Sequence, residues 1–243
     1  LLLSTYYFRF ILPNILFRFM RNVLFIMPLL LFALGATDVF NVFNIKSYVE
    51  GDYRYKEKHC YEGFEGFRET DLRDDTRTFI YREVLQSAQK YNTWWIGRSP
   101  ARGNETERFS ALSEITGREE RWGNEVGILN IFTWTGIIGV ILYGLVFYWA
   151  SYLAVSQSKN IFSKMLGIFI AFHWAYTWVE NINYFTLTTF FLWIMIGVCF
   201  SKSFREMSND EIRFWVQGIF CKQCMSTDNL RPINKKSADE STL

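Results

Sequence analysis

The chain alternates between long apolar stretches and one long charged segment. Residues 22–43 and 125–155 each contain an apolar run that is long enough, at about 1.5 Å of rise per helical residue, to cross about 30 Å of hydrocarbon. The stretch 165–200 is also apolar but too long for one span, and a polar run at 180–183 divides it. We therefore expect a transmembrane helix at 22–43, another at 125–155, and a transmembrane helical hairpin at 165–200.

The polar segments complete the expected architecture. Residues 1–21 are interpreted as the end of a preceding helix and a cytoplasmic connector, which implies that the protein continues at its N-terminal side. Residues 44–124 contain no apolar run of spanning length and are rich in charged residues, although 76–90 is predicted to form an amphipathic surface helix. The predicted fold class is an all-α integral membrane protein with about four transmembrane helices and a long, partly helical extracytoplasmic loop.

Basic residues in the short connections set the orientation. The positive-inside rule applies to short loops and to the residues next to the ends of spans. Six such residues fall on one side of the predicted membrane, namely Arg18, Arg21, Lys159, Lys164, Lys202 and Arg205. This side is predicted to be cytoplasmic and to include the tail 201–243, so the loop 44–124 and the 180–183 turn lie on the opposite side.

The composition narrows the function classes. The formal net charge is +2 and the basic residues form no polybasic run, which excludes a nucleic-acid partner. Aromatic residues make up 19% of the chain, which favours membrane lipid as a partner. A single CxxC at Cys221 and Cys224 lacks the second pair of ligands that a zinc site needs, so no metal and no other cofactor is expected.

An arginine-rich segment is the strongest candidate for chemistry. Between residues 94 and 139 there are five arginines and no lysine: Arg98, Arg102, Arg108, Arg118 and Arg121. Guanidinium groups suit bidentate binding of phosphate, and a hydrogen bond to a charged group is worth roughly 1.5–3 kcal/mol. Gly97, Pro100 and Gly103 predict a tight turn that holds Arg98 close to Arg102. These arginines are predicted to bind a pyrophosphate; alternatively they pair with the five nearby glutamates as a solvated surface.

Carboxylates at the edges of the predicted spans are the next candidates. Glu125 stands at the start of the predicted 125–155 helix and can act as a general base on a sugar hydroxyl, but the helix dipole also favours an acidic residue in a first helical turn. Glu180 and Asn181 are candidate sugar-binding residues, and a turn between helices needs polar residues in any case. Gly136 and Gly144 belong to a set of small residues that is expected to permit close helix packing.

The order of these motifs resembles a known family. A Gly97-Arg98 turn late in the outer loop, a polar pair, and a helix containing Gly-Ile-Ile-Gly at 136–139 are similar to the C-terminal half of the bacterial O-antigen polymerase and O-antigen ligase family. The centre of the pattern departs from the family, because Asn124-Glu125 stands where ligases usually have His. This departure favours a polymerase-like or divergent member.

The resemblance implies a specific activity and location. The expected enzyme is a glycosyltransferase of the bacterial inner membrane that transfers lipid-linked oligosaccharide repeat units from undecaprenyl pyrophosphate, together with other polysaccharide-assembly proteins. The arginines would hold the pyrophosphate, Glu125 would act as the catalytic base, and no metal would be needed. Two alternatives remain: a transporter or flippase of lipid-linked sugars, which would place charges and broken helices near the bilayer midplane, and a non-catalytic membrane subunit.

Overall fold

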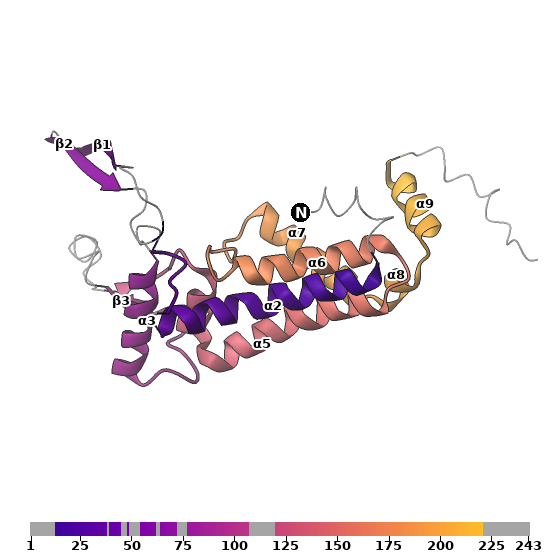
Figure 1. The fold of residues 1–243 in the computed structure, drawn as a ribbon, viewed down its shortest axis with the longest axis horizontal. Coiled ribbons are helices and arrows are strands. Elements are labelled where there is room, and N and C mark those ends of the chain that lie inside the picture. The colour runs from indigo at the N-terminus through magenta and orange to yellow at the C-terminus, as the bar shows by residue number, and fades with distance from the viewer. Residues whose placement is uncertain are drawn as a thin grey trace, which may run out of the picture.

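The computed structural model describes residues 13–37, 39–44, 48, 54–61, 64–71, 77–106 and 120–220. Most of the described chain is helical, in α2 (Asn14–Ala36), α3 (Thr78–Tyr91), α5 (Gly127–Gln157), α6 (Ile161–Tyr176), α7 (Leu187–Phe200), α8 (Lys202–Glu206) and α9 (Asn209–Phe220). Helices α2, α5, α6 and α7 run along the long axis of the molecule, with α3 at one end and α8 and α9 at the other (Figure 1). We call these the α3 end and the α8 end.

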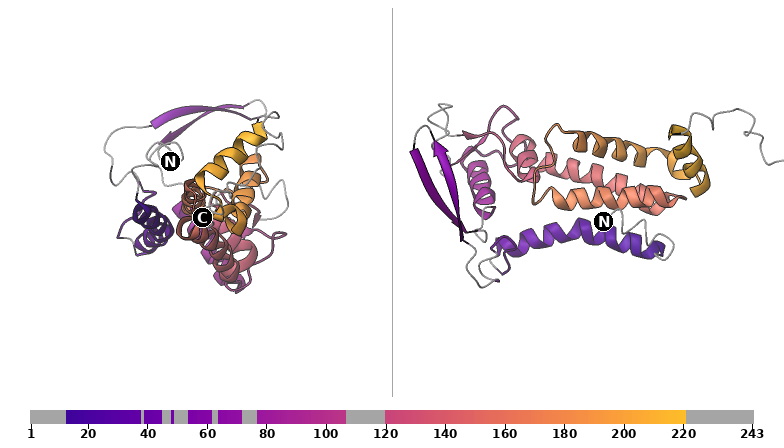
Figure 2. Two further views of the ribbon diagram at one scale, coloured as in Figure 1. Left: turned by 90° about the vertical axis from the view of Figure 1, so that its right-hand side faces the viewer. Right: turned by 90° about the horizontal axis from the view of Figure 1, so that it is seen from above.

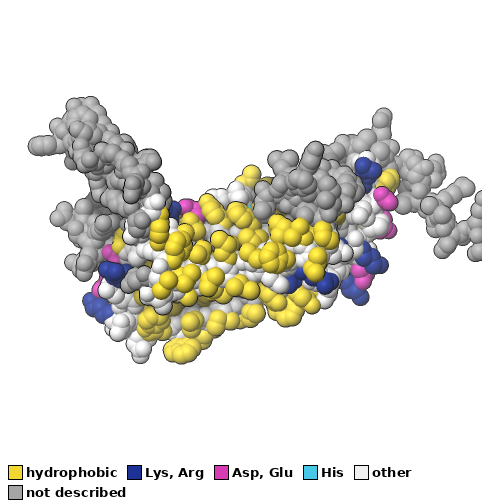
Figure 3. Space-filling view, viewed as in Figure 1, with side chains coloured by type: hydrophobic (Ala, Val, Ile, Leu, Met, Phe, Trp, Pro, Cys, Tyr) yellow, Lys and Arg dark blue, Asp and Glu magenta, His cyan; other side chains and the backbone are white. Residues whose placement is uncertain are grey.

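The four long helices differ in length. α2 and α5 are each long and apolar enough to cross a membrane, while α6 and α7 are apolar but have 16 and 14 residues. At about 1.5 Å per residue these shorter helices extend roughly 24 and 21 Å. Large hydrophobic side chains on α2, α5 and α7 are exposed, and they form a continuous apolar surface between the two ends (Figure 3). The structure therefore contains two candidate membrane spans.

The helix boundaries shift relative to the expected spans. α2 begins at Asn14, directly after Pro13, and ends at Ala36, so Arg18 and Arg21 lie within the helix and not in a connector. The apolar residues between these arginines continue the helical pattern. At the C-terminus of α2 the Thr37 hydroxyl donates to the Ala33 carbonyl. The predicted hairpin at 165–200 is divided by residues 177–186 into α6 and α7.

Side-chain caps set the first turns of the two helices of the hairpin. The Asn160 side chain accepts a hydrogen bond from the Ser163 amide before α6, and Thr186 accepts one from Thr189 before α7. The 76–90 prediction corresponds to α3.

Strands in the charged loop depart from the all-α expectation. β1 (Arg54–Tyr61) and β2 (Phe64–Asp71) pair antiparallel with Tyr61 opposite Phe64, and only two residues, ending in Gly63, separate them. Such a short connection with glycine favours a hairpin, and the tyrosines and phenylalanines of this segment favour strands. A second pair, β3 (Asn104–Glu105) and β4 (Glu120–Arg121), is also antiparallel.

One hydrophobic core joins α3 to the bundle. Buried side chains of α3, α5, α6 and α7 form a single cluster, which includes Ile80, Val84, Phe147, Ile170 and Leu192. Figure 2 shows α2 along one side of this bundle, where its contacts are mostly with α6. The core therefore fixes α3 against the start of α5.

The short-loop basic residues gather at the α8 end. The Arg21 guanidinium donates to Ser156 at 3.1 Å, and the Lys164 ammonium donates to Asn14 at 2.7 Å. The backbone of Lys159 donates to the Arg205 carbonyl at 2.9 Å. The parallel α2 and α6 and the antiparallel α5 thus bring together basic residues that are far apart in sequence. Cys221 and Cys224 lie outside the described residues.

Candidate site at the break of helix α5

A turn inserts into a break in α5. At Gly136 the backbone leaves the helical region (φ 65°, ψ −165°), so the preceding carbonyls and the following amides lose their usual helical partners. The turn at 94–99 supplies new ones. Four backbone hydrogen bonds join the two segments: Arg98 N to Thr133 O (2.7 Å), Ser99 N to Trp134 O (3.1 Å), Ile137 N to Trp94 O (2.8 Å) and Ile138 N to Trp95 O (3.4 Å).

Two glycines make this close approach possible. Gly97 and Gly136 both have positive φ, at 73° and 65°. A Cβ on Gly136 would lie 2.3 Å from the carbonyl carbon of Trp95, and one on Gly97 would lie 2.5 Å from the Thr135 amide nitrogen. The two ends of the motif pattern, the Gly97-Arg98 turn and the Gly136–Gly139 segment, are therefore in direct contact. Gly136 serves as a break in the helix, whereas Gly144 lies against the Trp174 ring as a packing residue.

The turn places Arg98 in a buried ion pair. Its side chain is 7% exposed, and its Nη2 lies 3.0 Å from Oε1 of Glu120. The guanidinium also donates to the Gly103 carbonyl at 2.7 Å and stacks 3.9 Å from the ring centroid of Tyr91. The contacts of Arg98 thus connect α3, the 94–99 turn and β4 with the break in α5.

Arg102 shares the same carboxylate. Its Nη2 lies 2.6 Å from Glu120 Oε1, and its side chain is 55% exposed. The hydrogen bond from Arg102 is the largest influence on Glu120 and, with the Gly103 amide and Arg98, lowers the pKa of this carboxyl to about 2 against the opposing effect of burial. The tight turn that the sequence predicted therefore does bring two guanidinium groups onto one anionic group.

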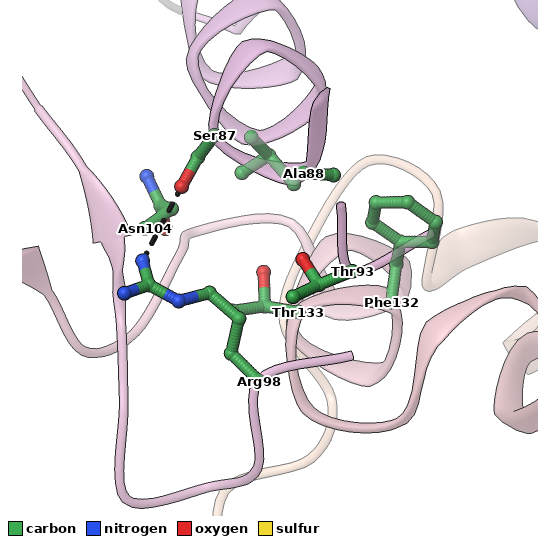
Figure 4. Close-up of a pocket in the computed structure, with 8 residues that line it drawn as sticks. Ser87, Ala88, Thr93, Arg98, Asn104, Phe132 and Thr133 are labelled. Carbon is green, nitrogen blue, oxygen red and sulfur yellow. Dashed lines mark hydrogen bonds between the residues drawn. The ribbon is translucent and has the colours of Figure 1, made fainter. Parts of the chain in front are cut away.

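A small cavity lies beside Arg98. Arg98 points from the turn toward Ser87 and Asn104, with Thr133 beside its side chain (Figure 4). The cavity is about 10 Å³, roughly the space of one water molecule. Asn104 Oδ1 and Thr133 Oγ1 are buried there without a hydrogen-bond partner. This cavity is too small to hold a diphosphate.

Glu125 stands at the exposed rim of the site. Its Oε1 lies 3.7 Å from Nη2 of Arg121, and its side chain is 54% exposed. The first amides of α5 do not face it, because Gly127 N donates to the Glu180 carbonyl and Ile128 N to the Thr177 carbonyl. Backbone groups of the 177–180 turn therefore cap the N-terminus of α5. Arg108 and Arg118 lie outside the described residues.

The 180–183 turn is held by partners that the sequence did not indicate. Glu180 Oε2 pairs with Arg77 Nη2 at 3.3 Å, and Arg77 also donates to the Val179 carbonyl at 2.9 Å. Asn181 is buried and accepts from the Asn183 amide at 3.0 Å. Asn183 in turn accepts from the Tyr143 hydroxyl. Arg77 escaped the sequence analysis because only the packing of α3 on the turn brings it to Glu180, and Asn183 because its partners Tyr143 and Gly127 lie on α5.

The charged groups of the site are arranged as pairs of arginine and glutamate at the α3 end. Within the described ranges, no cluster of three or more His, Cys, Asp or Glu residues is arranged to hold a metal ion. Comparison of the chain with family models, curated proteins and solved structures gives no match.

Proposed function

We propose that this chain is part of an integral membrane glycosyltransferase of the O-antigen polymerase and ligase type, acting on undecaprenyl-pyrophosphate-linked sugars at the outer face of the bacterial inner membrane. The contact between the Gly97-Arg98 turn and the Gly136–Gly139 segment carries the proposal. The resemblance to that family rests on these two motifs, and their contact makes them parts of one site.

The proposed membrane placement has four spans with the α8 end in the cytoplasm. The part of α5 after the break, residues 137–157, has 21 residues and a length of roughly 31 Å, which matches the hydrocarbon thickness. Exposed Ile141 and Leu142 on this part suit contact with lipid. The basic residues at the α8 end fit the positive-inside rule. In this placement α6 and α7 form the expected hairpin and the arginine turn lies outside the cytoplasm.

The proposed pyrophosphate site is the pair of guanidinium groups of Arg98 and Arg102. Glu120 lies between the two guanidinium groups, and a phosphate oxygen has the charge and spacing to take the place of a carboxylate oxygen there. Arg102 is the accessible arginine of this pair, and the buried Arg98 positions it. Arg121, on β4 beside Glu120, holds Glu125 at 3.7 Å between Nη2 and Oε1.

The proposed reaction needs no group beyond these side chains. The Glu125 carboxylate takes the proton of an acceptor hydroxyl, whose oxygen forms a bond to the anomeric carbon of the donor sugar. The bond from that carbon to the pyrophosphate breaks, and the pyrophosphate leaves with the electron pair. Arg102 and Arg121 stabilise the charge that develops on it. Glu180, whose side chain is 41% exposed, orients the sugar, and the buried Asn181 holds the turn that carries Glu180.

Polymer formation in cells tests the proposal. Arg102→Gln and Glu125→Gln in the full-length protein should abolish the polymer ladder while leaving the amount of protein in the membrane unchanged. Lys90→Gln is the matched control, since it removes a charge at the same end from an exposed pair with Glu105. Normal ladders from both test variants would refute the enzymatic assignment.

One observation favours a second candidate, a non-catalytic membrane subunit. The arginines named above pair with glutamates of the chain itself, and the cavity beside Arg98 holds about one water molecule. A subunit predicts that deletion of the whole protein abolishes the polymer while Arg102→Gln and Glu125→Gln do not. The transporter alternative gains no similar support, because the break of α5 at Gly136 lies before the 137–157 part proposed to cross the membrane, and residues 137–157 of α5 and all of α7 contain no Asp, Glu, Lys or Arg.

A further inference from the structure

Three basic side chains at the α8 end stand close together without an acidic partner. Arg18 and Arg21 are three residues apart on α2. The Lys164 ammonium of α6 donates a hydrogen bond to Asn14, which lies one helical turn before Arg18. Asn14, Arg18 and Arg21 follow one another at spacings of four and three residues, so they lie along one face of α2. No ion pair joins any of the three to a carboxylate of the described residues. Their positive charges are therefore uncompensated by this part of the chain.

Arg21 is held in place by neutral groups. Arg21 is 6% exposed, and its guanidinium donates to Ser156 at 3.1 Å and to the Asn22 side chain at 2.8 Å. It also lies 5.2 Å from the Tyr152 ring centroid and 5.8 Å from that of Tyr148. Burial of a charge with no opposite charge is costly, so an external anion near Arg21 would be stabilised.

The surface next to this cluster is apolar. Phe19, Val23, Ile26 and Leu30 are exposed along one face of α2, beside the arginine positions. Figure 3 shows basic side chains at the edge of the hydrophobic surface toward the α8 end. A ligand that matches both parts has a negative head and hydrocarbon tails.

We propose that Arg18, Arg21 and Lys164 bind the phosphate headgroup of an anionic phospholipid, whose acyl chains lie along the exposed face of α2. Basic residues at the cytoplasmic ends of spans attract anionic lipids at about 1 kcal/mol for each Lys or Arg. The inference rests on the membrane placement proposed above and is independent of the glycosyltransferase activity.

Lipid retention by the purified chain tests the inference. The whole chain is placed in bilayer discs of phosphatidylcholine and phosphatidylglycerol, extracted with mild detergent, and the lipids that remain bound are measured by mass spectrometry. The chain should retain phosphatidylglycerol in excess over its share of the bilayer. The Arg18→Gln, Lys164→Gln double variant should reduce this excess about tenfold, since two charges at about 1 kcal/mol each exceed the 1.4 kcal/mol that a factor of ten requires.

Controls distinguish the lipid site from attraction by net charge and from a free-phosphate site. Lys202→Gln removes a charge at the same end from an exposed pair with Glu206, and it should leave the excess unchanged. An equal loss in this variant would show that net charge alone attracts the lipid and would overturn the site. Release of the lipid by inorganic phosphate at constant ionic strength would identify a free-phosphate site instead. Circular dichroism verifies folding, and Arg18→Gln alone, at an exposed position, serves if the double variant does not fold.

Flotation with vesicles distinguishes failure of the membrane placement from failure of the lipid site. A chain that does not float with vesicles would overturn both. A chain that floats but retains the two lipids in proportion to the bilayer would overturn the lipid site alone.

Discussion

The two ends of the helical bundle use the same residue types differently. At the α3 end basic side chains are paired with acids of the chain, in the pairs Arg77–Glu180, Lys90–Glu105, Arg98–Glu120, Arg102–Glu120 and Arg121–Glu125. At the α8 end, within the described ranges, Lys202 is the basic residue with such a pair, and it joins Glu206 at 3.8 Å. Arg98, Arg102 and Arg121 at the α3 end therefore have acidic partners in the chain, whereas Arg18 and Arg21 at the α8 end have none among the described residues.

Local composition explains the difference. The stretches 14–36 and 157–176 contain no Asp or Glu, so a guanidinium on α2 meets hydroxyls, amides and tyrosine rings. The 94–125 stretch contains six glutamates and five arginines. Ion pairs there cross-link a loop that has few apolar residues to bury, whereas α2 is held by apolar packing on α6.

The largest effect is expected where the α3 end joins α5. Gly136→Val places a branched side chain at positive φ against the backbone of Trp95, and strain and overpacking together should cost about 2–6 kcal/mol. Chemical unfolding in detergent measures the change. Gly197→Ala is the matched control, since nothing lies within 4 Å of its Cβ position, and it should change stability by less than about 1 kcal/mol. Equal stability of the two variants would mean that the docking of the 94–99 turn does not stabilise the break in α5.

Removal of the shared carboxylate should have the next largest effect. Glu120→Gln leaves the buried Arg98 guanidinium without its counter-ion, which should cost about 2–3 kcal/mol. Arg18→Gln, at the α8 end, breaks no ion pair of the described chain and should change stability by less than about 0.5 kcal/mol. Unfolding curves of both variants in the same uncharged detergent check the contrast. Similar losses of unfolding free energy in both variants would mean that paired and unpaired arginines contribute equally to stability.

Acid should weaken the α3 end selectively. The pKa of Glu120 is lowered from 4.5 to about 2, chiefly by the hydrogen bond from Arg102. A depressed pKa contributes stability that is present above pH 4.5 and is lost as the pH falls toward 2, because the unfolded chain takes up the proton first. The pKa of Glu105 is lowered as well, mainly by the hydrogen bond from Lys90, and adds in the same direction.

The thermal midpoint in detergent at about pH 7, 4.5 and 3 measures this loss. The wild-type midpoint should fall more steeply below about pH 4.5 than that of Glu120→Gln. Parallel pH curves for the two proteins would contradict the linkage to Glu120.

The helices could be predicted from the sequence more readily than the site. Apolar runs and polar turns indicated α5 and the division between α6 and α7, because burial follows the local helical period. The start of α2 was misplaced, since two arginines suggested a connector where the helix that begins after Pro13 continues through the apolar residues around Arg18. The β1–β2 hairpin was not anticipated, because strand pairing in a charged loop leaves a weak apolar pattern.

The site depends on contacts between distant segments. The sequence indicated a turn that brings Arg98 near Arg102, but five glutamates were available as partners. The β3–β4 register, with Glu105 opposite Glu120, decides that Glu120 takes both arginines. Gly136 was expected to serve helix packing. Its role as a break follows from the docking of Trp95, 41 residues earlier, which no local pattern indicates.

Two partly exposed ion pairs, one at each end, provide the most closely matched comparison and the smallest expected change in stability. Glu125 pairs with Arg121 at 3.7 Å and Lys202 with Glu206 at 3.8 Å, both four residues apart and both with an exposed member. Because water screens such pairs, Glu125→Gln and Lys202→Gln should each change the free energy of unfolding by less than about 0.5 kcal/mol. The two variants should differ in function, since Glu125→Gln is expected to abolish the polymer and Lys202→Gln to preserve it. A large stability loss in Glu125→Gln would instead assign this carboxylate a structural role and would remove it as the proposed base.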